Sequence, residues 1–326
     1  MSWTIKGNGT GEDLLYSQAG TPSLDLRFAA TKSLNDYVSG NNLITFTRAS
    51  TGTFVDSNGL IQTAASNAPR FDHNPTTGES LGLLVEEART NLLLNSGTLS
   101  TQSATVTAVS TTLSFYGTGT VTLTGVSTAG PLVGTGANNR VSLTFTPTAG
   151  SLTLTVSGSV NNAQLEAGSF PTSYIPTTGS TVTRAADVAS MTGTNFSSWY
   201  RQSEGTWLIN FANDAAKQGA FRGVLSLGGN NTPRIQGNSV VGYGGSLSFT
   251  PTALTKAGLA YGSTEGRAVN GSVTSGAGGT IDIETYVDIG TGASSSPASY
   301  MLSTSIARLA YYPVRLPDTT LQAITQ

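Results

Sequence analysis

The chain has 326 residues, of which only 10% are charged, and its net charge is −2. Soluble globular proteins usually carry about 25% charged residues, so this surface is unusually poor in charge. Without a basic face, the chain lacks the electrostatic footprint of a nucleic-acid-binding protein. It contains no cysteine, which excludes disulfides and thiolate metal sites.

The amino-terminal sequence predicts a protein made in the cytoplasm. Residues 1–8 contain no basic region followed by an apolar core, so we expect no signal peptide. The longest apolar runs, 81–85 and 92–94, are far shorter than the ~20 residues of a membrane span. We therefore expect no membrane partner.

Residues 1–95 are predicted to form short strands separated by turns. In the turn 56–59, Gly59 suits the positive φ that such a connection needs. These strands are too discontinuous to bury a core of their own. The sequence therefore predicts an extended arm that docks on neighbouring subunits, and residues 86–94 would be either a short helical turn or an apolar strand that closes it. The expected strands cover residues 24–28, 43–47, 53–55 and 59–61.

Residues 96–187 are predicted to form a Thr/Ser-rich β-sandwich followed by a connector. Apolar and hydroxyl side chains alternate along residues 120–124, 141–145 and 151–156, so each strand has one apolar face and one polar face. The connector begins near residue 162, and Pro171 and Pro176 keep it extended.

Residues 188–326 are predicted to form a second sandwich. Asn270-Gly271 is a strong hairpin signal because both residues tolerate positive φ. A last strand over 305–312 precedes a short helix over 316–324, with Asp318 at its start. About a dozen short strands without crossover helices predict an all-β fold, an extended N-terminal arm followed by two antiparallel β-sandwich (jelly-roll-like) domains. Further strands are expected over 206–211, 223–227, 247–249, 259–261 and 281–286.

Three stretches are specific enough to carry a resemblance. The first combines LDLRF (24–28) with LITFTRASTGTFVDSNGLI (43–61), and the second combines PRFDH (69–73) with GLLVEEARTNLLL (82–94). The third runs from QLEAGSFPTSYIPT (164–177) through RAAD (184–187). Together they resemble the modular structural proteins of tailed bacteriophages, of the head-spike, head-fibre and decoration type.

The resemblance also bears on the two predicted sandwiches. The third stretch usually follows a carbohydrate-binding-module-like β-sandwich. Residues 306–318 resemble the last strand and closing turn of a concanavalin A-like (laminin-G-like) sandwich.

This resemblance implies a non-enzymatic virion protein, either a capsid decoration (cement) protein or a head fibre. It would be made in the host cytoplasm and displayed on the particle exterior. Its arm would bind the major capsid protein or other virion proteins by strand addition and apolar anchoring. Family analogy implies a homo-oligomer, with a trimer as the expected number. The expected attachment residues are Leu24, Phe28, Phe46, Arg48, Phe54 and Arg70.

A tail fibre that recognises a host-surface glycan is the first alternative. Trp199 and Tyr200 lie just before a predicted strand, where exposed rings would stack on sugars. Trp207 alternates with Ile209 and Phe211 and is expected in the core instead.

A polysaccharide-degrading enzyme is the second alternative. Asp282 and Glu284 would lie on one face of a strand, as the acid and nucleophile of laminarinase-type enzymes do. Those enzymes place Glu, then Asp, then Glu in order, whereas this chain has Asp282, Glu284 and Asp288. The pattern therefore favours solvent-facing strand carboxylates.

The remaining polar motifs predict no cofactor. His73 is the single histidine, and no Gly-x-Ser-x-Gly elbow accompanies it, so we expect a turn histidine hydrogen-bonded within the arm. A calcium ion on a sandwich rim is the one metal that the sequence leaves open, with Asn213-Asp214 or Asn230-Asn231 as ligands.

Overall fold

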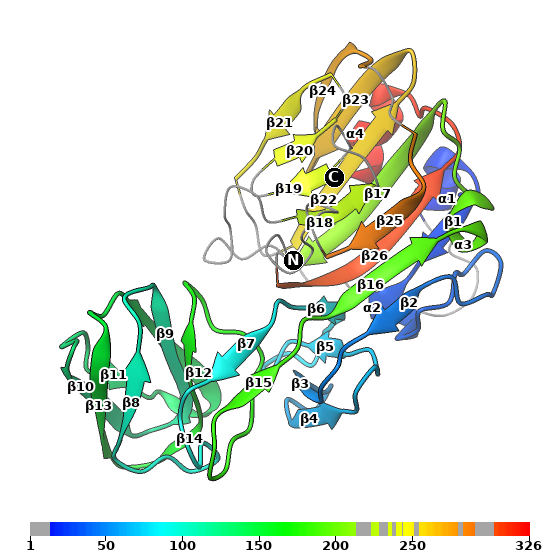
Figure 1. The fold of residues 1–326 in the computed structure, drawn as a ribbon. Helices are drawn as coiled ribbons and strands as arrows, with labels where there is room; N and C mark the ends of the chain where they lie inside the picture. Colours follow the sequence, from blue (N-terminus) through cyan, green and yellow to red (C-terminus); the bar gives the residue numbers. More distant parts are fainter. Residues whose placement is uncertain are drawn as a thin grey trace.

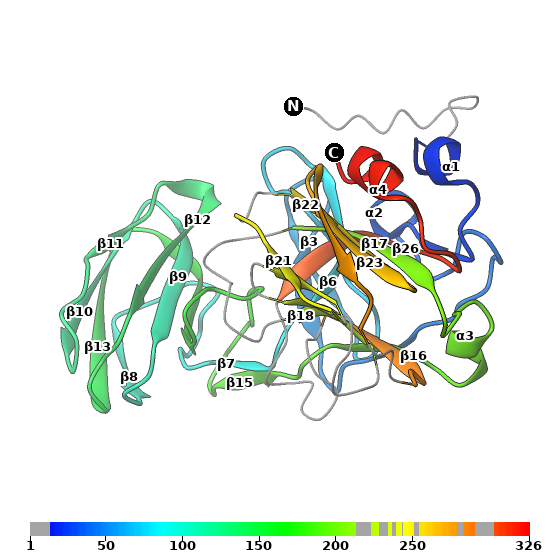
Figure 2. The same cartoon turned by 90° about the horizontal axis from the view of Figure 1, so that it is seen from above.

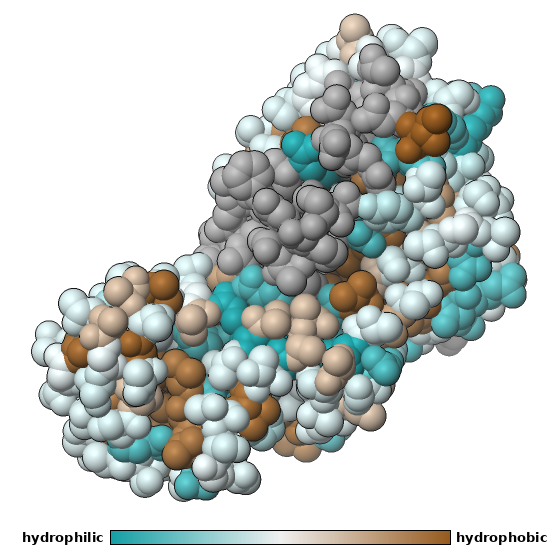
Figure 3. Space-filling view, in the orientation of Figure 1, coloured by the Kyte–Doolittle hydropathy of each residue, from teal (hydrophilic) through white to brown (hydrophobic). Residues whose placement is uncertain are grey.

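The structure, a computed structural model, describes residues 14–212, 223–227, 234–236, 239–242, 244–250, 254–279, 283–290 and 303–326. Figure 1 shows two lobes, a larger body and a smaller lobe joined to it by two neighbouring strands, and the space-filling view in Figure 3 shows the same two lobes. Both lobes are sandwiches of antiparallel sheets, which confirms the all-β sandwich fold class.

The first sheet of the body draws its strands from both ends of the chain. They are β1 (Leu24–Leu26), β5 (Phe71–His73), β6 (Ser80–Val85), β17 (Gly205–Ala212), β22 (Leu254–Tyr261), β23 (Thr264–Val269), β24 (Ser272–Ala277) and β26 (Thr304–Tyr312). Their order is β24-β23-β22-β17-β26-β6-β5, and β1 also pairs with β26.

The second sheet of the body has seven strands. They are β2 (Thr45–Thr47), β16 (Val188–Thr192), β18 (Gly223–Leu227), β19 (Arg234–Gln236), β20 (Ser239–Val241), β21 (Ser246–Ser248) and β25 (Tyr286–Ile289). Their order is β2-β16-β25-β18-β19-β20-β21.

The main core of the body contains apolar side chains from both of these sheets, including Trp207, Phe211 and Val287. As expected from its alternation with Ile209 and Phe211, Trp207 is buried. A smaller cluster packs around two helices, α1 (Leu14–Ala19) and α4 (Asp318–Ile324), which Figure 2 shows side by side. Two further short helices are α2 (Phe28–Thr31) and α3 (Thr194–Ser197).

The smaller lobe is the Thr/Ser-rich sandwich. One sheet contains β8 (Gln102–Val106), β10 (Thr120–Gly125), β11 (Leu132–Val133) and β13 (Gly150–Ser157), in the order β11-β10-β13-β8. The other contains β9 (Thr111–Gly117), β12 (Gly136–Phe145) and β14 (Val160–Ala167), in the order β12-β9-β14. The predicted alternation is present: Leu123 and Leu154 are buried opposite each other, whereas Thr122 and Thr155 are exposed.

Two short paired strands connect the lobes, β7 (Arg89–Asn91) and β15 (Val182–Arg184). The chain leaves the body through the first and returns through the second, so the smaller lobe is an insertion within the body. Residues 86–94 thus contain a strand rather than a helical turn. The hairpin of β3 (Gly52–Val55) and β4 (Ile61–Ala64) lies beside this connection in Figure 1.

The first 95 residues do not form the extended arm that the sequence predicts. In β1, Leu24 pairs with Tyr311 of β26, while Leu83 of β6 pairs with Ile306 of the same strand. Strand β2 pairs with β16. These strands pair with strands of the carboxyl-terminal half of the same chain and pack against its apolar side chains. They are therefore part of the body.

The two turns predicted from glycine positions are confirmed. Asn270 and Gly271 have φ values of 46° and 81° in the turn between β23 and β24. Gly59 has a φ of 77° in the turn between β3 and β4. His73 lies on β5 rather than in a turn, and its Nδ1 is 3.0 Å from the carbonyl oxygen of Val55. Within the described part of the chain, no helix is long and apolar enough to cross a membrane.

Candidate functional site at the lobe junction

The three stretches that carry the phage resemblance meet at one place, the junction between the lobes. Arg48 follows β2, Arg70 precedes β5, Glu86 follows β6, and Arg184 and Asp187 come at and after β15. Their side chains form a continuous set of ion pairs, which we call the junction network.

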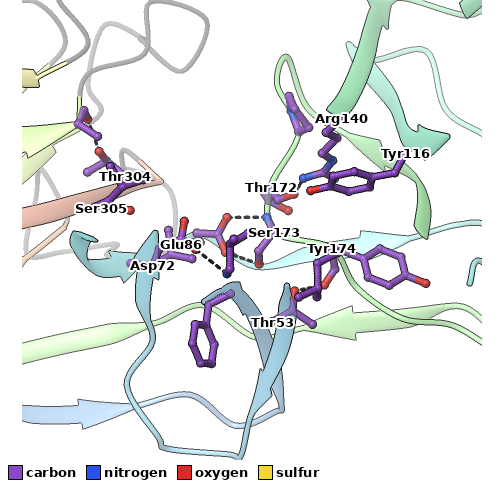
Figure 4. A pocket seen from close by; sticks show the side chains of 17 residues that line it. Thr53, Asp72, Glu86, Tyr116, Arg140, Thr172, Ser173, Tyr174, Thr304 and Ser305 are labelled. Atoms are coloured by element: carbon purple, nitrogen blue, oxygen red, sulfur yellow. Dashed lines mark hydrogen bonds between the residues drawn. The ribbon is translucent and has the colours of Figure 1, made fainter. Parts of the chain in front are cut away.

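Glu86 is the carboxylate that links the two halves of this network. Its Oε2 lies 2.8 Å from Nη1 of Arg70 and 2.6 Å from Nη1 of Arg184. Its Oε1 accepts a 2.7 Å hydrogen bond from the backbone N–H of Ser173, and the Ser173 hydroxyl donates to Oε2. Figure 4 shows Ser173 directly against Glu86. A strand of the body and the connector of the smaller lobe are thereby held by one side chain.

Asp187 is the second carboxylate. Its Oδ1 lies 3.0 Å from Nη1 of Arg48, and its Oδ2 is paired with Nη2 of Arg70. Oδ2 also accepts the backbone N–H of Glu86 at 2.8 Å, and the backbone N–H of Asp187 returns a hydrogen bond to the Glu86 carbonyl. Asp187 therefore fixes the point where the chain re-enters the body.

All five charged side chains of the network are removed from water, with side-chain exposures of 2% or less. Burial alone would raise the pKa of Glu86, but the charges of Arg184 and Arg70 and the hydrogen bonds from Ser173 hold it well below its usual range. Burial lowers the pKa of Arg184, whereas the carboxylates of Glu86 and Asp187 outweigh burial and raise the pKa of Arg70. The five side chains pair only with one another and with nearby backbone and Ser173 groups, which suits a fixed joint.

Uncharged hydrogen bonds fix the connector on the other side of the joint. The Asn91 amide on β7 donates to the carbonyls of Ala163 and Ile175 and accepts from the N–H groups of Leu93 and Leu165. Each of these bonds is between 2.9 and 3.1 Å long, and Asn91 is fully buried. This side chain uses its whole hydrogen-bonding capacity to hold the connector against the smaller lobe.

Glu166 plays a similar part at the end of β14. Its Oε1 accepts the N–H of Thr172 at 2.8 Å and the Gln164 amide at 2.6 Å, and its Oε2 accepts the Thr172 hydroxyl at 2.7 Å. Its fully buried carboxylate is thus satisfied by local donors.

A cleft of about 190 Å³ lies beside the junction network, with walls from both lobes. The body contributes residues of β3, β5, β6 and β26, and the smaller lobe contributes Tyr116 of β9, Arg140 of β12 and the connector residues 171–174. In Figure 4, Thr304 and Ser305 lie on one side of the cleft, and Tyr116 and Arg140 lie together on the other.

The aromatic and cationic side chains of the cleft are only partly covered. Tyr116 and Phe54 are half-buried. Nη1 of Arg140 donates to the Thr172 carbonyl at 2.6 Å and Nη2 donates to the Ser114 hydroxyl at 2.8 Å, with the guanidinium 6.0 Å from the centre of the Tyr116 ring. The arrangement offers ring faces and hydrogen-bond donors in one hollow.

The structure places the expected attachment residues inside the protein. Leu24 and Phe28 are fully buried in the core of the body, and Phe46 packs against that core. The body covers Leu24 and Phe28 completely, so their expected role as apolar anchors for a neighbouring subunit is wrong, whereas Phe46 is only partly buried. Of the remaining three, Arg48 and Arg70 belong to the junction network and Phe54 lines the cleft.

The two expected glycan-stacking rings are also internal. Trp199 is 6% exposed and meets Trp207 edge-on at 5.5 Å between ring centres. Tyr200 is half-buried and stacks on Phe196 at 4.4 Å. The turn of α3 directs both rings into the aromatic core, so they offer no exposed platform.

The candidate catalytic and metal-binding residues are placed only in part. Asp282, Asn213-Asp214 and Asn230-Asn231 lie outside the described residues. The expectation of a solvent-facing strand carboxylate is wrong for Glu284, which is buried just before β25, and its backbone N–H donates to the Gln202 side chain at 2.9 Å. Burial raises the pKa of Asp288, on β25, to about 6. Among the described residues, no group of three or more His, Asp or Glu side chains is placed to hold a metal ion.

The sequence alone did not predict Glu86, Arg184 and Asp187 as network members, nor Tyr116 and Arg140 as cleft residues. All three missed network members stand inside the motifs that carry the resemblance, so the signal was present in the sequence. Charged residues within otherwise apolar or turn-forming motifs were the clue that these positions are paired and buried. Tyr116 and Arg140 carry no such signal: they are paired across β9 and β12 of the smaller lobe, and the opposite wall of their cleft comes from the body.

No family model and no curated protein matches this chain. Among solved structures, the CBM40 of a Ruminococcus gnavus IT-sialidase aligns with a TM-score of 0.32 and 14% identity, over 40% of this chain and 88% of that module. Trypanosoma rangeli sialidase with sialic acid aligns with a TM-score of 0.31 and 14% identity, over 42% of this chain and 26% of that enzyme. The receptor-binding domain of botulinum neurotoxin type G gives 0.29 and 9%, over 43% and 40%. Likenesses this distant carry no functional argument.

Proposed function

We propose that this chain is a non-enzymatic structural protein of a tailed-bacteriophage virion, a capsid decoration or head-fibre protein displayed on the particle exterior. The observation that supports this most is the convergence of the three resembling stretches on the junction network. In a mechanical protein, motifs of this kind hold one module rigidly on another.

The chemistry of the junction favours the same role. A buried, fully charged network contributes little net stability compared with apolar packing. Any rearrangement that separates its partners is strongly destabilising, because it leaves a buried charge without a partner. The two lobes are therefore held in one arrangement. The low charge content of the surface also suits a protein that stays packed among other subunits.

Attachment to the particle takes a different form from docking by an arm. Because Leu24 and Phe28 are core residues, contact with the capsid or with sister subunits would use the outer surface of the folded lobes. By analogy with the resembling proteins, the assembly is proposed to be a homo-oligomer, with a trimer as the expected number.

Immunogold labelling of purified virions tests this proposal and separates it from its rivals. Antibody raised against the folded chain is expected to decorate the head. Labelling confined to tail tips would favour a receptor-binding tail fibre. Virions without label, together with new reducing ends when purified protein is incubated with host capsule, would contradict a structural role.

A further inference from the structure

We propose that the cleft between the lobes is a binding site for a single saccharide unit. This goes beyond the structural role, since a protein that only cements a shell needs no such site. Ligand sites in proteins occur preferentially where two domains meet, in hollows with apolar walls and a few convergent polar groups. The cleft beside the junction network has this position and this composition.

The size of the cleft limits the ligand. Its volume of about 190 Å³ is smaller than the roughly 300–1,000 Å³ of clefts that hold drug-sized molecules. A single pyranose ring is a ligand of suitable size, and a longer glycan would enter by one terminal residue.

Three groups at the cleft have hydrogen-bonding capacity that the protein does not use. Within the described part of the chain, the Tyr116 hydroxyl and the Ser305 hydroxyl make no hydrogen bond, although both residues line the cleft. The buried Nε of Arg140 likewise has no partner there. The two hydroxyls are reachable from the cleft, and a few convergent polar groups in one hollow are what the site of a polar ligand requires.

The partly covered rings supply the other half of saccharide recognition. A sugar presents C–H groups on its ring faces and hydroxyls at its edge. The half-buried rings of Tyr116 and Phe54 offer apolar surface for the faces, while the hydroxyls of Tyr116 and Ser305 offer hydrogen bonds for the edge.

The walls of the cleft are fixed before a ligand arrives. Glu86 and Ser173 both line it and both belong to the joint described above, which ties the two walls together. A pre-formed site loses less conformational freedom on binding, which favours measurable affinity for a small ligand. Many copies on one particle would strengthen individually weak contacts.

The test is a titration of the purified full-length chain with D-glucose, D-galactose, N-acetyl-D-glucosamine and D-glucuronate, followed by saturation-transfer NMR. At least one sugar is expected to bind, and Tyr116→Ala is expected to weaken it at least tenfold. Tyr116→Phe, which removes only the hydroxyl, and Ser305→Ala should each weaken it severalfold. Tyr37→Phe is the matched control, because Tyr37 is 57% exposed and is not part of the cleft.

Two results would overturn the inference: no saturation transfer to any of the four sugars at millimolar concentration, or binding that is unchanged in Tyr116→Phe, Ser305→Ala and Tyr116→Ala alike. Should Tyr116→Ala fail to fold, the two conservative variants decide the matter alone. The virion proposal stands or falls separately, because the titration uses protein alone and the immunogold experiment uses particles alone.

Discussion

At the scale of single residues, Glu86 has the largest expected effect. Glu86→Gln keeps the shape of the side chain but leaves Arg70 and Arg184 buried without their shared carboxylate. Breaking a buried ion pair in this way costs about 3–5 kcal/mol of unfolding free energy. Equilibrium denaturation with urea measures this loss.

Glu79→Gln is the matched control for this variant, because the same chemical change is made there on an exposed carboxylate. It is expected to change the free energy of unfolding by less than about 0.5 kcal/mol. Equal effects of the two substitutions would mean that the junction network does not hold the molecule together.

Glu86 also predicts how stability depends on acid. The pKa of this carboxyl is lower in the folded protein than in the unfolded chain, so the folded state binds fewer protons. Its contribution is present above the unfolded pKa of about 4.3 and is lost as the pH falls below that value. The melting temperature of the wild type should therefore fall between pH 5 and pH 3, and the fall should be shallower in Glu86→Gln. Parallel curves for the two proteins would contradict the assignment.

The contribution of Asp288 to stability is expected to change with pH in the opposite direction. Burial raises its pKa from 3.8 to about 6, so the folded state holds a proton that the unfolded chain releases. This contribution is present below pH 4 and is lost as the pH rises through 6. Asp288→Asn should therefore stabilise the protein at pH 7.5 by about 1 kcal/mol, after allowance for solvent screening, and have little effect at pH 4. Thermal unfolding at the two pH values measures this difference, and a destabilised variant at pH 7.5 would contradict it.

At the scale of strands, the local sequence pattern predicted where a strand occurs better than it predicted which strand pairs with it. Alternation along residues 120–124 predicted β10 and its buried face. Asn270-Gly271 predicted the turn of the hairpin that β23 and β24 form. The strand at Leu24 was also expected, but its partner Tyr311 lies at the other end of the chain. Nothing in a short stretch states which distant strand will complete its hydrogen bonds, and so a strand of the body was taken for part of an arm.

The same limit applies to the site. Arg48 and Arg70 were selected from the sequence as attachment residues. The sequence alone does not distinguish an arginine that binds a partner protein from an arginine buried in an internal ion pair. Asp187, the carboxylate that pairs with both, lies 139 residues from Arg48 and 117 residues from Arg70. Trp199 was misplaced for a related reason, since its burial depends on Trp207 and Tyr311 rather than on its neighbours in sequence.

The pairing of β6 with β26 can be tested through one glycine. Gly82 has a φ of 95°, and a Cβ added there would lie 2.0 Å from the backbone oxygen of Ile306. Gly82→Ala is therefore expected to cost at least about 2 kcal/mol of unfolding free energy, because neither the left-handed conformation nor the backbone contact can relax cheaply. Gly179→Ala, where no atom lies within 4 Å, is the control and should be close to neutral in the same urea titration. A neutral Gly82→Ala would contradict the close approach of these strands.

At the scale of the whole molecule, one joint fixes the two lobes relative to each other. The smaller lobe is inserted in the body through β7 and β15, and the junction network closes over the point of insertion. Arg48, Glu86 and Arg184, from three stretches far apart in the sequence, thereby form a single joint between the two sandwiches.

The distance between the lobes in solution tests most directly whether the joint holds them in one arrangement. Because the chain has no cysteine, Thr122→Cys in the smaller lobe and Ser272→Cys in the body, both exposed, can carry a pair of spin labels. Pulsed electron paramagnetic resonance, with labelled chains diluted in unlabelled protein, is predicted to give one narrow distance distribution that broadens when Glu86→Gln is added. A broad distribution in the otherwise unchanged protein would contradict a fixed joint.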